Sequence, residues 1–180
     1  KYKTRGEKNH KTPSARVLMA NPDANEAAFT GDLAHIAEGT YLARDMAWEP
    51  GKDLHPEVFV DRVRNAFRGV DNLSIKVLNV PEMEQRKMGG ILGVGKGSVH
   101  DPRLMVIEYK GAGGAPIAIV GKGITFDTGG ISLKRNTNMW QMKSDMSGAA
   151  AVAGTMLATA KRGAPVHLVG IMPLAENMPS

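Results

Sequence analysis

The sequence predicts an α/β fold: a three-layer αβα domain around a central, mostly parallel or mixed sheet, truncated at its C-terminal side. Three observations lead to this prediction. Short apolar runs alternate with helical segments along the 180 residues. The apolar run 115–120 leads into a glycine-rich stretch with many charged residues, 120–145, and a small-residue helix follows it. Strand, glycine-rich loop and helix is the arrangement in which open α/β sheets place their chemistry.

Composition agrees with a globular protein, with 42% hydrophobic and 23% charged residues. No apolar run approaches the ~20 residues of a membrane-spanning helix, so we expect no membrane contact. The absence of cysteine excludes disulfides and thiolate metal sites and is compatible with the cytoplasm, where we predict the protein to act. Residues 1–16 carry six basic side chains and one acidic one, which accounts for the whole net charge of +5. We therefore expect no basic patch for nucleic acid on the folded body.

The N-terminal third is predicted to be helical after a polar arm. Residues 1–20 show no long apolar period and are interpreted as a basic linker from a missing N-terminal domain. Residues 21–47 are predicted to form a helix because their apolar residues approximate one stripe, and Pro50–Gly51 ends it. A second helix is predicted to begin at Pro56, a residue favoured at the first helical position, with His55 at the N-cap.

The remaining elements are assigned from apolar periodicity and from turn residues. They are a strand at 73–80, a short helix at 81–88, a glycine loop at 89–98, strands at 103–110 and 117–120, a long loop at 120–145, a helix from 147 to about 161, and a strand at 166–172. Because helices alternate with short apolar strands, we expect the strands to run largely parallel.

Two acidic residues of the long loop are candidate metal ligands. Asp127 follows an apolar strand, and Asp145 lies near the start of the following helix. Carboxylates that converge at a strand end suit a divalent cation and would repel each other without one. A structural alternative stays open for each residue, because Asp127 could form an Asx turn before Gly129–Gly130 and Asp145 could cap its helix.

The same loop contains a long and specific motif in two segments. The segments are VGKGITFDTGGISLK at 120–134 and MKSDMSGAA at 142–150. They resemble the signature of the leucyl aminopeptidases, the two-metal cytosol aminopeptidase family. Further similarity runs from about residue 38 to residue 180 and includes LARD at 42–45, HPE at 55–57, GVGKGS at 93–98 and ENMP at 176–179. The resemblance implies that residues 21–180 are the N-terminal part of a metallopeptidase catalytic domain.

The resemblance also implies a site for two divalent metal ions, Mn²⁺ or Zn²⁺. Lys122 and Asp145 would bind one ion, and Asp127 would bridge both ions. Lys134 would be catalytic, because it would keep its charge and polarise the substrate carbonyl. Met142 would line the pocket for the first side chain of the substrate, and Lys134, Asp127 and Asp145 would also contact the substrate. All five residues are read from the motif at positions 120–150.

The activity implied by the resemblance is hydrolysis of the N-terminal residue of peptides, preferably leucine-like, by a hydroxide held between the two ions. A cytoplasmic homohexamer acting on peptides is implied as well. The family completes its site with an Asn-Thr-Asp-Ala-Glu-Gly-Arg motif downstream of ENMP, and this chain does not contain that motif. We therefore expect the isolated chain to be inactive and poorly folded. This chain also departs from the family at two positions, because the family usually has Asn near Trp48 and Thr near His55.

Parts of the sequence are compatible with three other interpretations. A non-catalytic hexameric scaffold or a DNA-binding relative of the family is compatible with the basic arm but has no need of the candidate ligands. The tripeptide Asp127–Gly129 matches the aspartic-protease motif, but no second copy occurs in the sequence. Residues 90–97 nearly match a phosphate-binding loop, but Gly97 stands where that loop has Ser or Thr.

Overall fold

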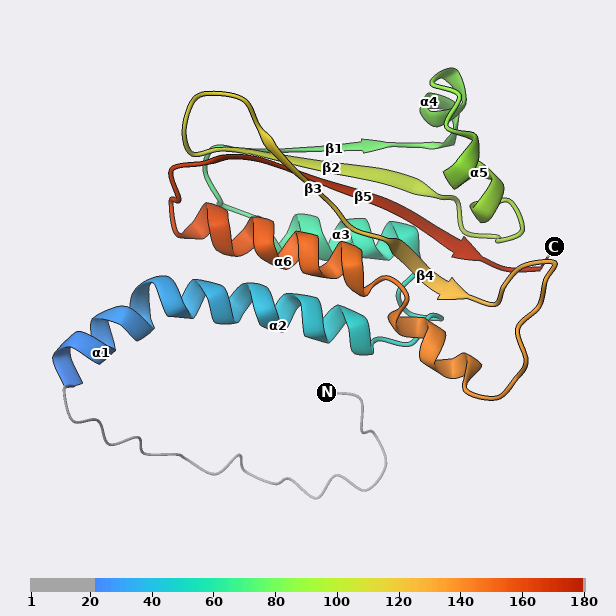
Figure 1. The fold of residues 1–180 in the computed structure, drawn as a ribbon, viewed down its shortest axis with the longest axis horizontal. Coiled ribbons are helices and arrows are strands. Elements are labelled where there is room, and N and C mark those ends of the chain that lie inside the picture. Colours follow the sequence, from blue (N-terminus) through green and yellow to red (C-terminus); the bar gives the residue numbers. More distant parts are fainter. Residues whose placement is uncertain (1–21, 180) are drawn as a thin grey trace.

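The computed structural model describes residues 22–179 as a layered α/β domain. Its helices are α1 (Pro22–Ala28), η1 (Phe29–Leu33), α2 (Ala34–Trp48), α3 (Pro56–Ala66), α4 (Val80–Gln85), α5 (Gly89–Gly95), η2 (Met139–Ser144) and α6 (Ser147–Lys161). Its strands are β1 (Leu73–Leu78), β2 (Arg103–Lys110), β3 (Ile117–Val120), β4 (Gly123–Asp127) and β5 (His167–Asn177). Figure 1 shows the sheet as one layer, α3 and α6 against one of its faces, and α2 against α6. The predicted α/β fold class is confirmed.

The sheet is mixed, which is one of the two sheet types that the sequence predicts. Its strand order is β1-β2-β5-β3, and β4 also pairs with β5. The pairs β1–β2 and β2–β5 are antiparallel, whereas β3 and β4 run parallel to β5. The parallel pairs arise because α6 carries the chain back from the end of β4 to the start of β5, as a crossover helix does. The ends of β4 and β5 therefore meet at one edge.

The predicted helix at 21–47 is present but is interrupted. Gly31, inside η1, has φ −93° and ψ −116°, which is not helical. After this break α2 continues to Trp48 and contacts α6 at very short range. A Cβ atom added to Gly39 would lie 2.3 Å from the Gly154 carbonyl oxygen. The two backbones therefore touch, and only glycine fits at this crossing.

The start of α3 agrees with the sequence prediction. Pro56 is the first helical residue, and His55 occupies the N-cap with φ −93° and ψ 173°. The His55 side chain makes no capping hydrogen bond. Phe59 and Val63 of α3 are fully buried in the core between the helices and the sheet.

Three segments differ from the sequence prediction. The glycine loop predicted at 89–98 contains α5, the loop predicted at 120–145 begins with β4, and the strand predicted at 166–172 extends to Asn177. In each case tertiary pairing or packing overrides weak local propensity. Gly123, for example, pairs with Leu174 of β5, where a Cβ atom would lie 2.5 Å from the Leu174 side chain.

The architecture argues against two of the alternative interpretations, the phosphate-binding loop and the aspartic protease. The glycine-rich segment 90–97 follows α4 rather than a buried strand, which is not the context of a phosphate-binding loop. An aspartic protease would need an all-β lobe around Asp127–Gly129, but α6 follows this segment.

No helix of residues 22–179 is long and apolar enough to cross a bilayer. The predicted linker at 1–20 lies outside the described residues.

His167, at the start of β5, gives the fold a pH-dependent contact. Its ring nitrogens each lie 2.9 Å from an acceptor, Nδ1 from the Gly114 carbonyl and Nε2 from Glu108 Oε1. These hydrogen bonds, to Gly114 first and then to Glu108, raise the pKa of His167. The hydrogen bond from His167 in turn lowers the pKa of Glu108. A raised histidine pKa stabilises the folded state below the unfolded value of about 6.5, and this contribution disappears as pH rises through the folded pKa.

We expect His167→Gln to lower the melting temperature most at about pH 6 and progressively less toward about pH 9. Scanning calorimetry of the wild type and the variant across this range measures the difference. His35→Gln is the matched control, because His35 lies 3.9 Å from Glu38 on the surface of α2 without a second acceptor of this kind. A difference in melting temperature that stays constant with pH would contradict the prediction.

Candidate metal centre

Asp127 is the last residue of β4, and its carboxylate is held from three directions. Its Oδ1 accepts hydrogen bonds from the Gly129 backbone N–H at 2.9 Å and from the Asn177 side-chain amide at 2.7 Å. Its Oδ2 forms a close ion pair with the Lys134 ammonium. The Asx turn that the sequence left open is therefore present, and it coexists with the ion pair.

The environment of Asp127 favours the carboxylate form. Burial raises the pKa of this carboxyl, but the hydrogen bonds from Lys134, Gly129 and Asn177 together outweigh burial and hold the pKa below its ordinary value. The side chain is only 16% exposed. A half-buried, ionised oxygen at a strand end is the form that a divalent cation binds.

The loop after β4 folds back and brings Lys134 to Asp127. The Lys134 N–H donates to the Thr128 carbonyl at 2.8 Å, which closes the loop. Gly129 and Gly130 have φ values of +91° and +64°, a region that glycine adopts without steric cost. The glycine pair in the motif therefore determines the position of the candidate catalytic lysine.

Met142 and Lys134, two of the four candidate substrate contacts, lie together. The Met142 sulfur, on η2, lies 3.3 Å from Lys134 Nζ. Met146, the next methionine, is fully buried in the core instead.

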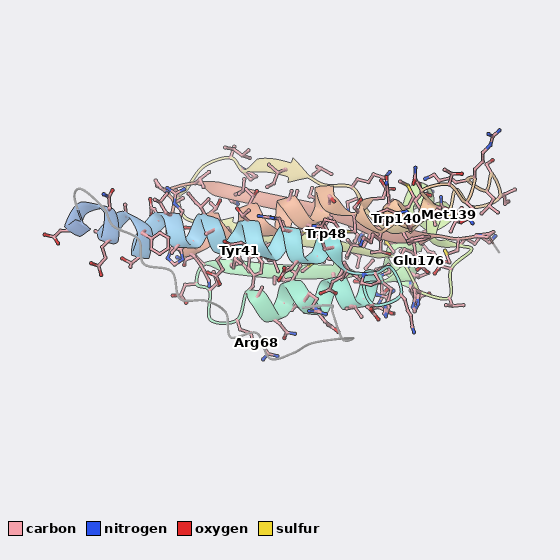
Figure 2. The ribbon with its side chains drawn as sticks, turned by 90° about the horizontal axis from the view of Figure 1, so that it is seen from below. Tyr41, Trp48, Arg68, Met139, Trp140 and Glu176 are labelled. Atoms are coloured by element: carbon pink, nitrogen blue, oxygen red, sulfur yellow. The ribbon has the colours of Figure 1, made fainter. Side chains whose placement is uncertain are left out.

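In Figure 2, Trp140 on η2 and Trp48 at the end of α2 lie close together, and both line a pocket of about 390 Å³.

Lys122 and Asp145 form the second ion pair of the motif. Lys122 Nζ lies 2.9 Å from Asp145 Oδ1 and 2.8 Å from Oδ2. Lys122 links β3 to β4, and its carbonyl accepts a hydrogen bond from the Ala149 N–H at 2.8 Å. Asp145 ends η2 and does not cap α6, whose N-cap is Met146 without a capping side-chain bond. The alternative reading of Asp145 as a helix cap is therefore wrong.

The four charged residues of the motif thus form two ion pairs. Each pair joins β4 or the residue before it to the segment 134–145. Within residues 22–179, no hydrogen bond or ion pair connects one pair to the other. The structure therefore places Lys134 with Asp127 and Lys122 with Asp145.

The donor set fits a divalent ion. Asp127 and Asp145 supply oxygen donors and Lys122 supplies an amine, all of which suit Mn²⁺ or Zn²⁺. Asp145 Oδ2 is shielded from solvent and makes no well-directed hydrogen bond, although it lies close to the Lys122 ammonium. The lysine charges compensate the carboxylates where a dication would do so. Lys122 could bind an ion only after losing its proton, which an adjacent dication favours.

Asn177 is a site residue that the sequence did not single out. It ends β5, pairs with Asp127 across the sheet edge and donates its amide to the Asp127 carboxylate. The Thr128 N–H donates to the Asn177 carbonyl at 2.9 Å. Two features of the sequence could have pointed to Asn177. Its side chain is an amide close after an apolar strand, and it belongs to the ENMP segment that resembles the family.

A pocket of about 660 Å³ lies beside the loop that carries Asp127. It is lined on one side by Gly129, Gly130 and Asn177, and on the other by α5 and Lys96. The pocket therefore adjoins the loop after β4, but none of the four charged residues of the motif lines it.

A mixed α/β sheet whose strand ends carry carboxylate and amine groups defines an α/β domain that can hold a divalent cation. The chain belongs to the cytosol aminopeptidase family, and the model of that family's catalytic domain matches residues 41–180. All the candidate ligands lie inside this matched segment.

Named relatives agree with this assignment. A probable cytosol aminopeptidase of Rickettsia bellii is 47% identical over 147 residues, which cover 81% of this chain and 29% of the relative. A probable cytosol aminopeptidase of Rhodopseudomonas palustris is 43% identical over 185 residues, covering 99% of this chain and 36% of the relative. The chain thus spans about a third of the length of these relatives.

Solved structures show the same fold. The bottromycin maturation enzyme BotP in complex with Mn superposes with a TM-score of 0.82 at 36% identity, covering 96% of this chain and 37% of BotP. The leucyl aminopeptidase of Trypanosoma brucei in complex with bestatin superposes with a TM-score of 0.75 at 33% identity, covering 82% of this chain and 29% of that enzyme.

Proposed function

We propose that the protein is a metal-dependent aminopeptidase that removes the N-terminal residue of peptides and prefers leucine-like residues. The observation that carries the proposal is the pair of carboxylate–lysine contacts, Asp127 with Lys134 and Asp145 with Lys122, on the family motif. The relatives' names and the Mn complex of BotP support it. A non-enzymatic scaffold has no use for two half-buried carboxylates held beside lysines at the end of a strand and in the loop that follows it.

Asp127, Asp145 and Lys122 would hold the metal, with two divalent ions, Mn²⁺ or Zn²⁺, in the complete site. The ions, when bound, supply positive charge for the peptide carbonyl and make water a stronger nucleophile at neutral pH. Ligands that the family contributes from its Asn-Thr-Asp-Ala-Glu-Gly-Arg motif are not present in these 180 residues. We infer from this that the isolated chain has no turnover.

The chain's own residues prepare the site for a peptide end. The carboxylates of Asp127 and Asp145, each paired with a lysine in this structure, would accept hydrogen bonds from a free N-terminal amine. Lys134, held by Asp127 and in contact with Met142, directs its charge to where the substrate carbonyl becomes more negative during the reaction. Met142 contacts the first side chain, and its flexible, apolar thioether accommodates leucine-like groups.

The organisation of the whole protein is also part of the proposal. Residues 21–180 are the first part of the catalytic domain, and residues 1–20 link it to a preceding domain. The working protein is a cytoplasmic homohexamer. Sedimentation of the full gene product would give six times the mass of one subunit, and a monomer would contradict this.

The test uses the full gene product and leucine p-nitroanilide. We expect turnover that is abolished by a chelator and restored by Mn²⁺ or Zn²⁺, and no cleavage of the N-acetylated substrate, which lacks a free amine. The 180-residue chain alone, assayed in parallel, is expected to show no turnover. Chelator-resistant turnover, or cleavage of the N-acetylated substrate, would contradict the proposed function.

A further inference from the structure

Two histidines and a glutamate meet where α3 begins and where the chain enters β2. The imidazole rings of His55 and His100 are stacked, with centroids 3.9 Å apart and planes inclined by 4°. Glu57, in the first turn of α3, completes the group. One ligating atom from each residue lies within 4.8 Å of the others, and the three side chains are half-buried. None of the three belongs to the candidate metal centre.

The Nδ1 atom of His55 has no hydrogen-bond partner among the described residues and is shielded from solvent. A buried polar atom without a partner costs free energy, so its position calls for an explanation. Although His55 stands at an N-cap, its ring does not cap the helix. The ring faces Glu57 Oε2 and His100 instead.

The distance between His55 and Glu57 is that of two ligands around a shared ion. His55 Nδ1 lies 3.4 Å from Glu57 Oε2, which is long for a hydrogen bond. Two ligand atoms each ~2.0–2.1 Å from a tetrahedral Zn²⁺ lie roughly 3.3 Å apart. A nitrogen of His100 lies within 4.8 Å of the ligating atoms of His55 and Glu57, and the His100 ring would tilt out of its parallel stack on His55 to direct that nitrogen to the same ion.

Arg103 holds Glu57 through one carboxylate oxygen and leaves the other oxygen facing His55. Its guanidinium lies 2.6 Å from Glu57 Oε1 and 3.5 Å from Asp101. The Arg103 side chain is only 18% exposed, and it also donates to the Pro102 carbonyl at 2.9 Å. Glu57 Oε2 therefore stays directed at His55. A ligating carboxylate that is itself oriented by a second residue is common in metal sites.

The local charge suits a cation. With both imidazoles neutral, the two carboxylates of Glu57 and Asp101 exceed the single positive charge of Arg103. Neutral imidazole is the form that binds metal.

From this geometry we infer that His55, Glu57 and His100 form a binding site for Zn²⁺ or a similar dication, separate from the carboxylate–lysine centre. Two imidazole nitrogens and one carboxylate oxygen are a common zinc donor set, with water in the remaining position. The ion would link the first turn of α3 to the segment before β2, two segments about 45 residues apart in the chain. The bound ion would thus hold the segment before β2 against the start of α3 and would take no part in peptide hydrolysis.

The experiment detects imidazole bound to zinc in the full gene product. The protein is loaded with Zn²⁺, freed of loose metal, and studied by X-ray absorption at the zinc edge and by elemental analysis. Because Lys122, Asp127, Lys134 and Asp145 include no histidine, imidazole scattering does not come from these four residues, and its loss in the histidine variants assigns it to the new site. We expect imidazole scattering in the wild type and in Asp145→Asn, with one zinc per chain fewer in His100→Asn. Loss of one of three ligands should weaken zinc binding at this site by at least about 100-fold.

His35→Gln is the matched control, because it removes one imidazole beside Glu38, where residues 22–179 contain no cluster of potential ligands. It is expected to retain both the zinc content and the imidazole scattering. His55→Thr, a second variant, guards against misfolding of His100→Asn, and metal-free melting curves of both should match the wild type. Zinc bound in the wild type without imidazole scattering, or equal zinc content in wild type and both histidine variants, would overturn the inference. These outcomes are independent of aminopeptidase activity.

Discussion

Replacing Lys134 by alanine in the full gene product is expected to lower kcat and kcat/KM together by about 10²–10³-fold. The physical reason is that the ammonium faces a carbonyl oxygen whose negative charge grows only in the transition state. Lys134 is positioned for this role by its ion pair with Asp127 and by the closed loop from Thr128. Its Nζ atom lies beside Met142, the candidate contact for the substrate side chain.

The measurement is steady-state hydrolysis of leucine p-nitroanilide, together with metal content by elemental analysis. Lys134→Ala should keep its metal, because the carboxylates of Asp127 and Asp145 remain. Lys110→Ala is the matched control, because Lys110 is exposed, ends β2 and pairs with Glu108 of the same strand. Loss of metal in Lys134→Ala would show that the lysine supports the metal centre instead, and a rise in KM alone would indicate uniform substrate binding.

The ion pair of Lys134 with Asp127 illustrates what the sequence could predict. The two residues are seven positions apart in one loop, and the intervening glycine pair has the positive φ values that return the chain on itself. Local contacts of this kind are encoded within a short motif. The start of α3 is similar, because Pro56 and Glu57 favour a helix start without help from distant residues.

Asn177 and β4 illustrate what the sequence could not predict. Asn177 reaches Asp127 only because β4 and β5, 50 residues apart in the chain, end in register at one sheet edge. Register depends on pairing between distant segments, and no single stretch of sequence specifies it. The stacking of His55 on His100 is non-local in the same way, since the rings come from α3 and from the segment before β2. Residue type marked each side chain as a candidate, but only the fold brought them together.

The second large effect concerns Asp145. Asp145→Asn keeps the shape of the side chain and removes its charge, so metal affinity of the candidate centre is expected to fall by more than about 100-fold. Oδ2 of Asp145 is shielded from solvent and lacks a directed hydrogen bond, which is how an oxygen reserved for a cation should look. The substitution should weaken metal binding more than it weakens substrate binding in enzyme saturated with metal.

Stability separates this effect from simple misfolding. In metal-free protein Asp145 pairs with Lys122, whose side chain is 62% exposed, and pairs at such positions contribute only about 0–1 kcal/mol. The metal-free melting temperature of Asp145→Asn should therefore stay close to the wild type, while added Mn²⁺ should raise it far less. Asp61→Asn, on the exposed face of α3, is the control that should respond to Mn²⁺ as the wild type does. If Asp145→Asn retained its metal content and its full stabilisation by Mn²⁺, Asp145 would be a partner of Lys122 and nothing more, and the metal centre would have to lie elsewhere.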